Sequence, residues 1–403
     1  MINSVIIGGG ASGLALAIML KIKAPMISVT VLEANDRVGK KLALTGNGRC
    51  NISNMNLETC RYHGDSEFAE RIISSFGFKA QKEFFGELGI PFAVLEEGKA
   101  YPMSLQAASV VDALRFKAEE LGVEILVNEK VQEVRRIDGK FLVTTESNNF
   151  KCDTVTVASG GKAGGKLGSE LGYSVLKSFG HKIEKIFPSL VQIKTTPEVV
   201  RQLKGLKVMA DVTATSSSGV RSEYGEVLFC DYGLSGPPIL QVSRVCNGEK
   251  STVTLDVLPK MTEDEIVSEI EKRVQNFSAR PISELLTGFL HKRLGQVVIK
   301  TIGLNLNDNC KSISKADCVV LTKFLKCMTF NVVGTTGFEN AQVTAGGAQT
   351  TQFFDNMMSK KVKGLFAVGE VLNVDGDCGG FNLAFCWASS YAAALGIKEY
   401  LEC

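Results

Sequence analysis

The chain has 403 residues, which is long for one domain and comfortable for two or three. Lysine and arginine total 45 against 43 acidic residues, so no strong net charge favours a nucleic acid or an acidic membrane surface as partner. Eleven cysteines without a C-x-x-C pair, and only three histidines, argue against a disulfide framework and against a metal site. Because we find no export signal, we expect a cytoplasmic protein without a membrane span.

The first element in the chain is a strand–glycine loop–helix–strand unit. A buried strand at 4–7 runs into the loop Gly8-Gly9-Gly10-Ala11-Ser12-Gly13, and an apolar helix follows at 14–20. A second strand covers 27–32 and ends at Glu33, 20 residues beyond Gly13. This order and spacing are typical of a dinucleotide-binding βαβ unit.

Each polar or small position of this unit has a predicted task. Gly8 makes the tight turn, Gly10 lets the backbone approach a pyrophosphate, and Gly13 lets the helix pack closely on the strand. The helix N-terminus offers free N–H groups to the phosphates. Glu33 is predicted to accept hydrogen bonds from an adenosine ribose, which argues against a 2′-phosphate at this position.

The elements that follow continue an α/β domain up to about residue 188. A glycine-dotted loop at 37–51 is rich in hydrogen-bond donors, and the strand at 154–158 ends in Ser159-Gly160-Gly161. Between them we predict helices at 66–88 and 104–121, and a β-meander with strands at 123–127, 130–136 and 140–145.

From about residue 189 the pattern changes, which indicates an insertion. Strand-like runs at 190–193, 206–215 and 225–229 precede a mostly helical stretch at 262–326. We therefore predict a discontinuous domain, 1–188 with 334–403, around an inserted substrate or cap domain at 189–333. The insertion is predicted to be β-rich at about 189–260 and helical at about 261–326.

The end of the chain distinguishes between the two common dinucleotides. A buried strand at 365–368 leads into Gly369-Glu370, and Gly379–Asn382 then opens a helix at 383–401. The acidic side chain suits the hydroxyls of a ribitol chain, and the helix dipole favours negative charge at the pyrimidine edge of a flavin by up to about 1 kcal/mol. This return of the chain therefore favours FAD over NAD.

Five segments resemble the YhiN/BaiN-type, aminoacetone-oxidase-like, FAD-dependent oxidoreductases. They cover essentially the whole chain and include the particular motifs TGNGRCN and YGLSGP; the segments are 5–17, 45–54, 158–173, 225–241 and 364–391. The resemblance implies an α/β fold: a Rossmann-like FAD domain of the two-dinucleotide-binding type, with an inserted β-barrel-like plus helical domain.

The resemblance also implies FAD-binding roles for individual residues. Ala11 and Ser12 would bind the pyrophosphate, Glu33 the adenosine ribose, and Val131 the adenine. The remaining implied contacts are Lys40, Lys41, Arg49, Cys50 and Asn51 along the flavin, Gly160 closing over the cofactor, Gly369 and Glu370 at the ribitol, and Gly380, Phe381, Asn382 and Leu383 at the isoalloxazine.

The chain departs from the family pattern close to the expected flavin face. Cys230-Asp231 stands where the pattern has Thr-His, Cys378 where it has no cysteine, and Ala384 where it often has glutamine. Three catalytic candidates follow. Asp231 and Tyr232 either donate protons over the flavin or cap and pack a turn, and Cys50 is either a reactive thiol or a small buried side chain.

The leading hypothesis for function is FAD-dependent, NAD(P)H-driven reduction of a small conjugated or carbonyl-type molecule, with a steroid or bile acid suggested by the resemblance. Only one dinucleotide fingerprint is present, so NAD(P)H would bind transiently. One alternative is oxidation of a small amine such as aminoacetone with release of peroxide. The other is an RNA-modifying flavoprotein, although the near-neutral charge led us to expect no nucleic-acid partner.

Overall fold

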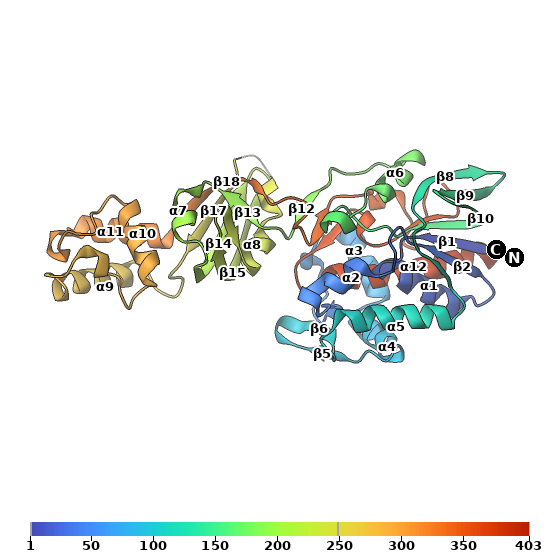
Figure 1. Cartoon of the computed structure of the whole chain (residues 1–403), viewed down its shortest axis with the longest axis horizontal. Coiled ribbons are helices and arrows are strands. Elements are labelled where there is room, and N and C mark those ends of the chain that lie inside the picture. The colour runs from blue at the N-terminus through green and yellow to red at the C-terminus, as the bar shows by residue number, and fades with distance from the viewer. Residues whose placement is uncertain (1, 248–249, 403) are drawn as a thin grey trace. The chain divides into compact units, whose positions relative to one another are not determined.

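A computed structural model describes residues 2–247 and 250–402 of the chain. They divide into two compact units: unit 1 consists of Met1–Pro188 with Ala341–Cys403, and unit 2 consists of Ser189–Asn340 (Figure 1). The predicted fold class, an α/β dinucleotide-binding fold with a barrel-like and helical insertion, is confirmed. The role of the insertion as a substrate or cap domain stays a prediction.

Unit 1 is built on a five-stranded parallel sheet. Its strands are short, and all but the edge strand at 124–126 are mostly buried, as expected where both faces of a parallel sheet are covered. Helices α1 (Ala11–Lys23) and α12 (Phe381–Glu402) lie side by side in this unit, so the two ends of the chain share one core (Figure 1). The strand order is β20 (Leu365–Ala367), β11 (Thr154–Val157), β1 (Asn3–Ile7), β2 (Ser28–Leu32) and β7 (Glu124–Leu126).

Two predicted elements of unit 1 differ in the structure. The helix expected at 66–88 is two helices, α3 (Ser66–Ser75) and α4 (Phe78–Glu87), because Gly77 takes an extended conformation between them. The strand expected at 123–127 does not belong to the meander, because β7 pairs with β2 in the parallel sheet. The meander consists of β8 (Val131–Ile137), β9 (Lys140–Thr145) and β10 (Asn149–Cys152).

Apart from α5, the other elements of unit 1 are short. Its remaining helices are α2 (Lys40–Leu44), α5 (Ala107–Glu120) and α6 (Leu171–Ser178), and its remaining strands are β3 (Ser53–Asn54), β4 (Tyr62–Gly64), β5 (Phe92–Val94), β6 (Lys99–Pro102), β19 (Val343–Ala345) and β21 (Val374–Gly376), with β12 (Phe187–Ser189) at the unit boundary. Across residues 2–247 and 250–402, helix length and hydropathy leave no helix able to cross a membrane.

Unit 2 combines a closed antiparallel barrel with a group of helices that share its core. Thr262 and Ser314 begin α9 (Glu263–Asn276) and α11 (Lys315–Lys326) with reciprocal capping boxes, which satisfy backbone N–H groups at the start of each helix. The barrel order is β13 (Ile193–Thr195), β16 (Gly233–Ser235), β15 (Gly219–Phe229), β14 (Lys207–Ser216), β17 (Thr252–Asp256) and β18 (Met328–Thr335), and the helices are α7 (Pro197–Gln202), α8 (Pro237–Val242), α9 (Glu263–Asn276), α10 (Lys292–Thr301) and α11 (Lys315–Lys326).

Candidate active site

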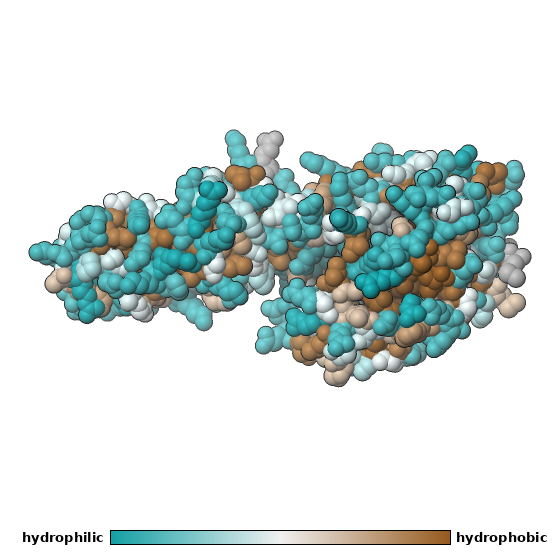
Figure 2. Space-filling model, in the orientation of Figure 1, coloured by the Kyte–Doolittle hydropathy of each residue, from teal (hydrophilic) through white to brown (hydrophobic). Residues whose placement is uncertain are grey.

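A cavity of about 590 Å³ lies in unit 1, where β1, β2 and β11 end and α1 and α12 begin. Its position outside the carboxyl ends of parallel strands is the usual place for a ligand in this kind of sheet. On the face drawn in Figure 2, apolar side chains gather over α1 and α12 of this unit. The predicted cofactor residues that line the cavity are Gly8, Gly10, Ala11, Ser12, Glu33, Lys40, Lys41, Val131, Gly160, Glu370, Asn382 and Leu383.

The glycines of the first loop meet three different steric demands. Gly8 has φ 112°, and a Cβ there would lie 2.6 Å from the carbonyl oxygen of Ala158. A Cβ on Gly13 would lie 1.9 Å from the carbonyl oxygen of Gly8, so helix α1 packs on the turn only without a side chain. A Cβ on Gly10 would meet no atom of the described residues within 4 Å. Gly10 therefore borders open space at the N-terminus of α1, as an approaching pyrophosphate requires.

The Glu33 carboxylate is held in place at the end of β2. Its Oε2 accepts a hydrogen bond from the Gly9 backbone N–H at 2.9 Å, and its Oε1 accepts from the backbone N–H of Asn35 at 2.8 Å. The side chain is 8% exposed and lines the cavity. Oε1 also accepts from the Asn35 side-chain amide at 2.5 Å, whereas Oε2 keeps a second lone pair. Glu33 can therefore hold the glycine loop and still accept from a ribose hydroxyl through Oε2.

We expect Glu33→Ala to lower the affinity for FAD by about tenfold or more, because charge-assisted hydrogen bonds are worth about 1.5–3 kcal/mol each. Glu33→Gln keeps the shape and an acceptor oxygen, so its loss should be smaller. Isothermal titration of the apoprotein with FAD measures both. Equal FAD affinity in the parent and in Glu33→Ala would contradict the ribose role.

A second polar group closes the middle of the cavity. Lys41 Nζ donates to Glu370 Oε2 at 2.7 Å, and the Thr344 backbone N–H donates to Glu370 Oε1 at 2.9 Å. The stem of Lys41 passes under the glycine-rich loop, since a Cβ on Gly164 would lie 3.4 Å from Lys41 Cε. The glycines at 160–168 therefore form a loop over this ion pair and do not build a second nucleotide-binding βαβ unit.

The residues of the cavity fit an FAD molecule. Ser159 lines it, and its buried Oγ has no hydrogen-bond partner among residues 2–247 and 250–402. A buried hydroxyl left in this way costs about 1–3 kcal/mol, which a bound polar ligand would recover. The open space at Gly10, the acceptor at Glu33 and the hydroxyl at Ser159 match a pyrophosphate, a ribose and further polar atoms of one dinucleotide.

The TGNGRCN loop lies beside the beginning of α12. Gly46, Asn47, Gly48 and Cys50 all have positive φ, so four left-handed residues bend the chain within five positions. The buried Oδ1 of Asn51 has no partner within the described ranges, and a Cβ on Gly380 would lie 2.8 Å from it. This places Asn51 against the helix start that was predicted to hold the isoalloxazine.

Several predicted cofactor residues contribute to the site without lining the cavity. Arg49 is exposed, and its guanidinium lies 5.1 Å from the centre of the Tyr101 ring, so it stacks on β6. The residues that do not line the cavity are Gly13, Arg49, Cys50, Asn51, Gly369, Gly380 and Phe381. Most of them are backbone or packing positions next to residues that do line it, and direct FAD contacts by them stay predictions.

Cys50 does not have the properties of a reactive thiol. The side chain is fully buried, and burial raises the pKa of its thiol to about 12. Thiolate chemistry needs a lowered pKa and access to solvent, and Cys50 has neither. The structure thus favours the packing alternative over the catalytic one.

We expect Cys50→Ser to keep at least half of the parent's turnover, and native iodoacetamide labelling to spare Cys50 while modifying the exposed Cys60 and Cys327. Peptide mass spectrometry reads out the labelling, and full unfolding before labelling is the control that exposes every thiol. Rapid labelling of Cys50 in the native protein would restore the catalytic alternative.

Asp231 and Tyr232 belong to unit 2, whereas the cavity belongs to unit 1. Asp231 pairs with Lys204 at 2.7 Å, and this hydrogen bond lowers the pKa of its carboxyl group. Asp231 is therefore ionised at neutral pH and unsuited to donate a proton, which weakens its predicted role. Burial raises the pKa of Tyr232, so its hydroxyl keeps its proton. Tyr232 as a donor stays a prediction.

Sequence reasoning missed several residues of the cavity. Thr45 and Lys166 line it from within the segments 45–54 and 158–173, but they were not singled out there. Gln342 lines it and Thr344 fixes Glu370, and neither belongs to a motif that signals a ligand. Cys386 also lines it, and burial raises the pKa of its thiol to about 11. Position in the chain was a weak signal for Thr45, Lys166 and Cys386, because they lie within segments that carry the family resemblance, whereas Gln342 and Thr344 had no such signal.

Comparison with known proteins identifies the family. The family model described as "HI0933-like protein Rossmann domain" matches residues 2–396. The chain is 34% identical to the 3-dehydro-bile acid delta(4,6)-reductase of Clostridium scindens, over 98% of both chains. It is 30% identical to the ribosomal RNA dihydrouridine synthase of Haemophilus influenzae, also over 98% of both chains.

Among solved structures, the fold is similar to that of 3-ketosteroid delta1-dehydrogenase from Sterolibacterium denitrificans. The TM-score is 0.51 at 10% identity, covering 99% of this chain and 100% of that chain. The predicted family is confirmed by the family model and by the relatives that share nearly the whole chain. The chain belongs to the HI0933-like Rossmann-domain family and is an enzyme of the flavin-dependent oxidoreductase class.

Proposed function

We propose that the enzyme uses FAD, reduced by NADH or NADPH, to reduce a carbon–carbon double bond conjugated to a carbonyl group. The observation that carries this proposal is the 34% identity, over almost the whole length, to a relative whose name describes reduction of a 3-keto bile acid at conjugated double bonds. The cavity supports it, because its polar groups suit one dinucleotide.

When bound, FAD supplies the hydride chemistry, and the protein supplies binding, orientation and charge. The α1 N-terminus with Ala11 and Ser12 would hold the pyrophosphate, and Glu33 the adenosine ribose. Glu370, fixed by Lys41 and the Thr344 backbone, would accept from the ribitol. Asn382 and Leu383, at the start of α12, would face the flavin ring, where the helix dipole favours negative charge.

The source of electrons is proposed to be a transiently bound NAD(P)H. The chain carries one βαβ fingerprint, and the glycines at 160–168 form a loop packed on Lys41. A second resident dinucleotide therefore has no Rossmann unit of its own in the described residues. A nicotinamide that binds only transiently and then dissociates could reduce FAD without such a second unit.

The second candidate substrate is a uridine in ribosomal RNA. The Haemophilus relative named as a ribosomal RNA dihydrouridine synthase is 30% identical over 98% of both chains, which favours this candidate specifically. The chemistry is the same, because the C5=C6 bond of uracil is conjugated to the C4 carbonyl just as the double bond of an enone is conjugated to its ketone. The two candidates differ in what holds the substrate, not in the step at the flavin.

The deciding experiment is anaerobic stopped-flow spectroscopy of the FAD-loaded enzyme. We expect NADH or NADPH to bleach the flavin band, and a 3-keto-4-ene steroid or a uridine-containing ribosomal RNA to restore it under anaerobic conditions, with one saturated bond formed per flavin. Failure of both nicotinamides to reduce the flavin would overturn the proposed electron source. Flavin bleaching by aminoacetone, with peroxide released in air, would establish the amine-oxidase alternative instead.

A further inference from the structure

Charge in unit 2 is divided between its helices in a way that the whole-chain balance hides. Helix α9 has five acidic residues against two basic ones. Helices α10 and α11, which contact each other, together have six basic residues and a single acid, Asp317. The Asp317 carboxylate accepts the hydrogen bonds of the Ser314 capping box, so it is committed to the helix start.

The cations of α10 and α11 are mostly available to solvent. Lys300, Lys315 and Lys323 are exposed and make no ion pair within residues 2–247 and 250–402. Lys292 and Lys326 are paired, with Glu284 and Asp256 respectively. Lys315 and Lys323 are eight positions apart on one helix and so share a face, and the exposed Val319 lies between them.

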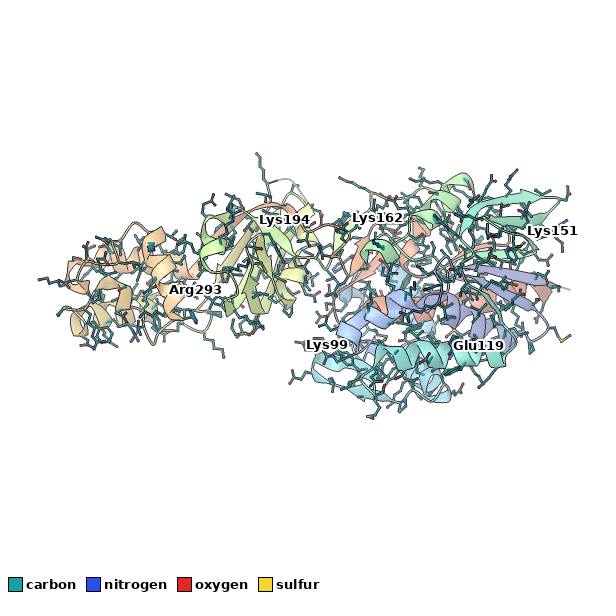
Figure 3. All side chains as sticks on the ribbon, in the orientation of Figure 1. Lys99, Glu119, Lys151, Lys162, Lys194 and Arg293 are labelled. Atoms are coloured by element: carbon teal, nitrogen blue, oxygen red, sulfur yellow. The ribbon has the colours of Figure 1, made fainter. Side chains whose placement is uncertain are left out.

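Neighbouring segments extend this basic surface in two directions. At one end, the Lys311 backbone N–H donates to the Ser278 carbonyl, and the Cys310 N–H donates to the Arg280 carbonyl. The exposed Arg280 and Lys311 therefore lie on two segments of the chain that are next to each other. At the other end, Arg293 donates to the Lys204 carbonyl oxygen at 2.8 Å. Figure 3 shows Arg293 where α10 adjoins the barrel.

Lys204 in turn pairs with Asp231 at 2.7 Å. Arg293 and Lys204 therefore connect α10 to the Asp231–Tyr232 turn, and the exposed cations of α10, α11 and the paired segments at 280 and 311 form the rest of the basic surface. A bile acid carries a single carboxylate, which an extended basic surface is not needed to bind, whereas the phosphates of an RNA repeat along the strand and attract lysine and arginine regardless of sequence.

We propose that this surface, defined by Arg280, Arg293, Lys300, Lys311, Lys315 and Lys323, binds the phosphate backbone of ribosomal RNA. The proposal rests on the second substrate candidate of the proposed function and extends it to a binding surface in unit 2. The exposed Val319 and Val320 add apolar contact area between the cations, suited to sugars and unstacked bases.

The test measures binding of the full-length, FAD-loaded enzyme to ribosomal RNA purified from Haemophilus influenzae, at salt concentrations from 50 to 200 mM. The variant is Lys300→Gln/Lys315→Gln/Lys323→Gln. The control is Lys79→Gln/Lys82→Gln/Lys177→Gln, which removes the same charge from exposed positions of unit 1. We expect the variant to bind at least about tenfold more weakly and its log–log salt slope to fall by about 2 to 3, because about three phosphate contacts are lost. The control should bind like the parent.

Flavin content and steroid turnover are recorded for every variant, so a misfolded protein is recognised and the single substitutions are then measured in its place. No RNA binding by the parent at 50 mM salt, or equal affinity in variant and control, would overturn the proposal. Steroid reduction without RNA binding would overturn this surface and leave the proposed function standing. RNA binding by an enzyme that reduces no conjugated double bond would support this surface and overturn the proposed function.

Discussion

Gly10→Val should yield a folded enzyme that does not hold FAD. A side chain at Gly10 meets no atom of the described residues within 4 Å, and its φ of −85° is open to any residue. The substitution therefore costs the apoprotein little, yet it fills the space at the α1 N-terminus that a pyrophosphate would occupy. We expect the dissociation constant for FAD to rise at least about 100-fold, or about 2.8 kcal/mol.

The matched control is Gly86→Val in α4, where a Cβ also meets no atom within 4 Å and the cavity is not involved. Urea denaturation of the two apoproteins should give free energies of unfolding within about 0.5 kcal/mol of the parent. Only Gly10→Val should then lose FAD in a titration. FAD retention by Gly10→Val at parental affinity would show that the cofactor does not cross this glycine loop.

The part of the site nearest the start of the chain was predictable because its determinants are local. Gly13 and Glu33 act within one βαβ unit, so sequence spacing alone carries their geometry, whereas the steric demand on Gly8 also comes from the distant Ala158 carbonyl. The contribution of the end of the chain to the α/β fold could also be recognised, since the segments after β20 and at the start of α12 keep the glycine signals of the family.

The middle of the cavity was not predictable as an assembly. Lys41 and Glu370 are 329 positions apart, and Thr344 reaches Glu370 only because β19 and β20 belong to the returning segment. The sequence predicts Lys41 and Glu370 as separate contacts and does not indicate Thr344, because no rule of sequence spacing connects the three residues. Long-range pairs of this kind are determined by tertiary packing, which local patterns in a single sequence do not predict.

The surroundings of Cys50 and Asp231 differ from what their sequence neighbours suggest. Cys50 lies between Arg49 and Asn51 in sequence, which suggests a lowered pKa, but its side chain points into the core and Arg49 stacks on Tyr101. The sequence suggests Asp231 as a proton donor, but its partner Lys204, 27 positions away, keeps it ionised.

The net charge of the whole chain, +2, does not reveal the opposite charges of α9 and of the α10–α11 pair.

Gly13→Ala should destabilise the apoprotein, in contrast to Gly10→Val. In a helix, glycine to alanine normally stabilises by up to about 1 kcal/mol, and Gly86→Ala in α4 should show that gain because its surroundings are open. At Gly13 the added Cβ would lie 1.9 Å from the Gly8 carbonyl oxygen, so α1 must move off the turn that begins the site. We expect a loss of about 3 kcal/mol in the free energy of unfolding, measured by urea denaturation without FAD.

A loss of stability in Gly13→Ala and a gain in Gly86→Ala would show that close packing of α1 on β1, and not helix propensity, requires glycine at position 13. A stability gain at both positions would contradict that packing.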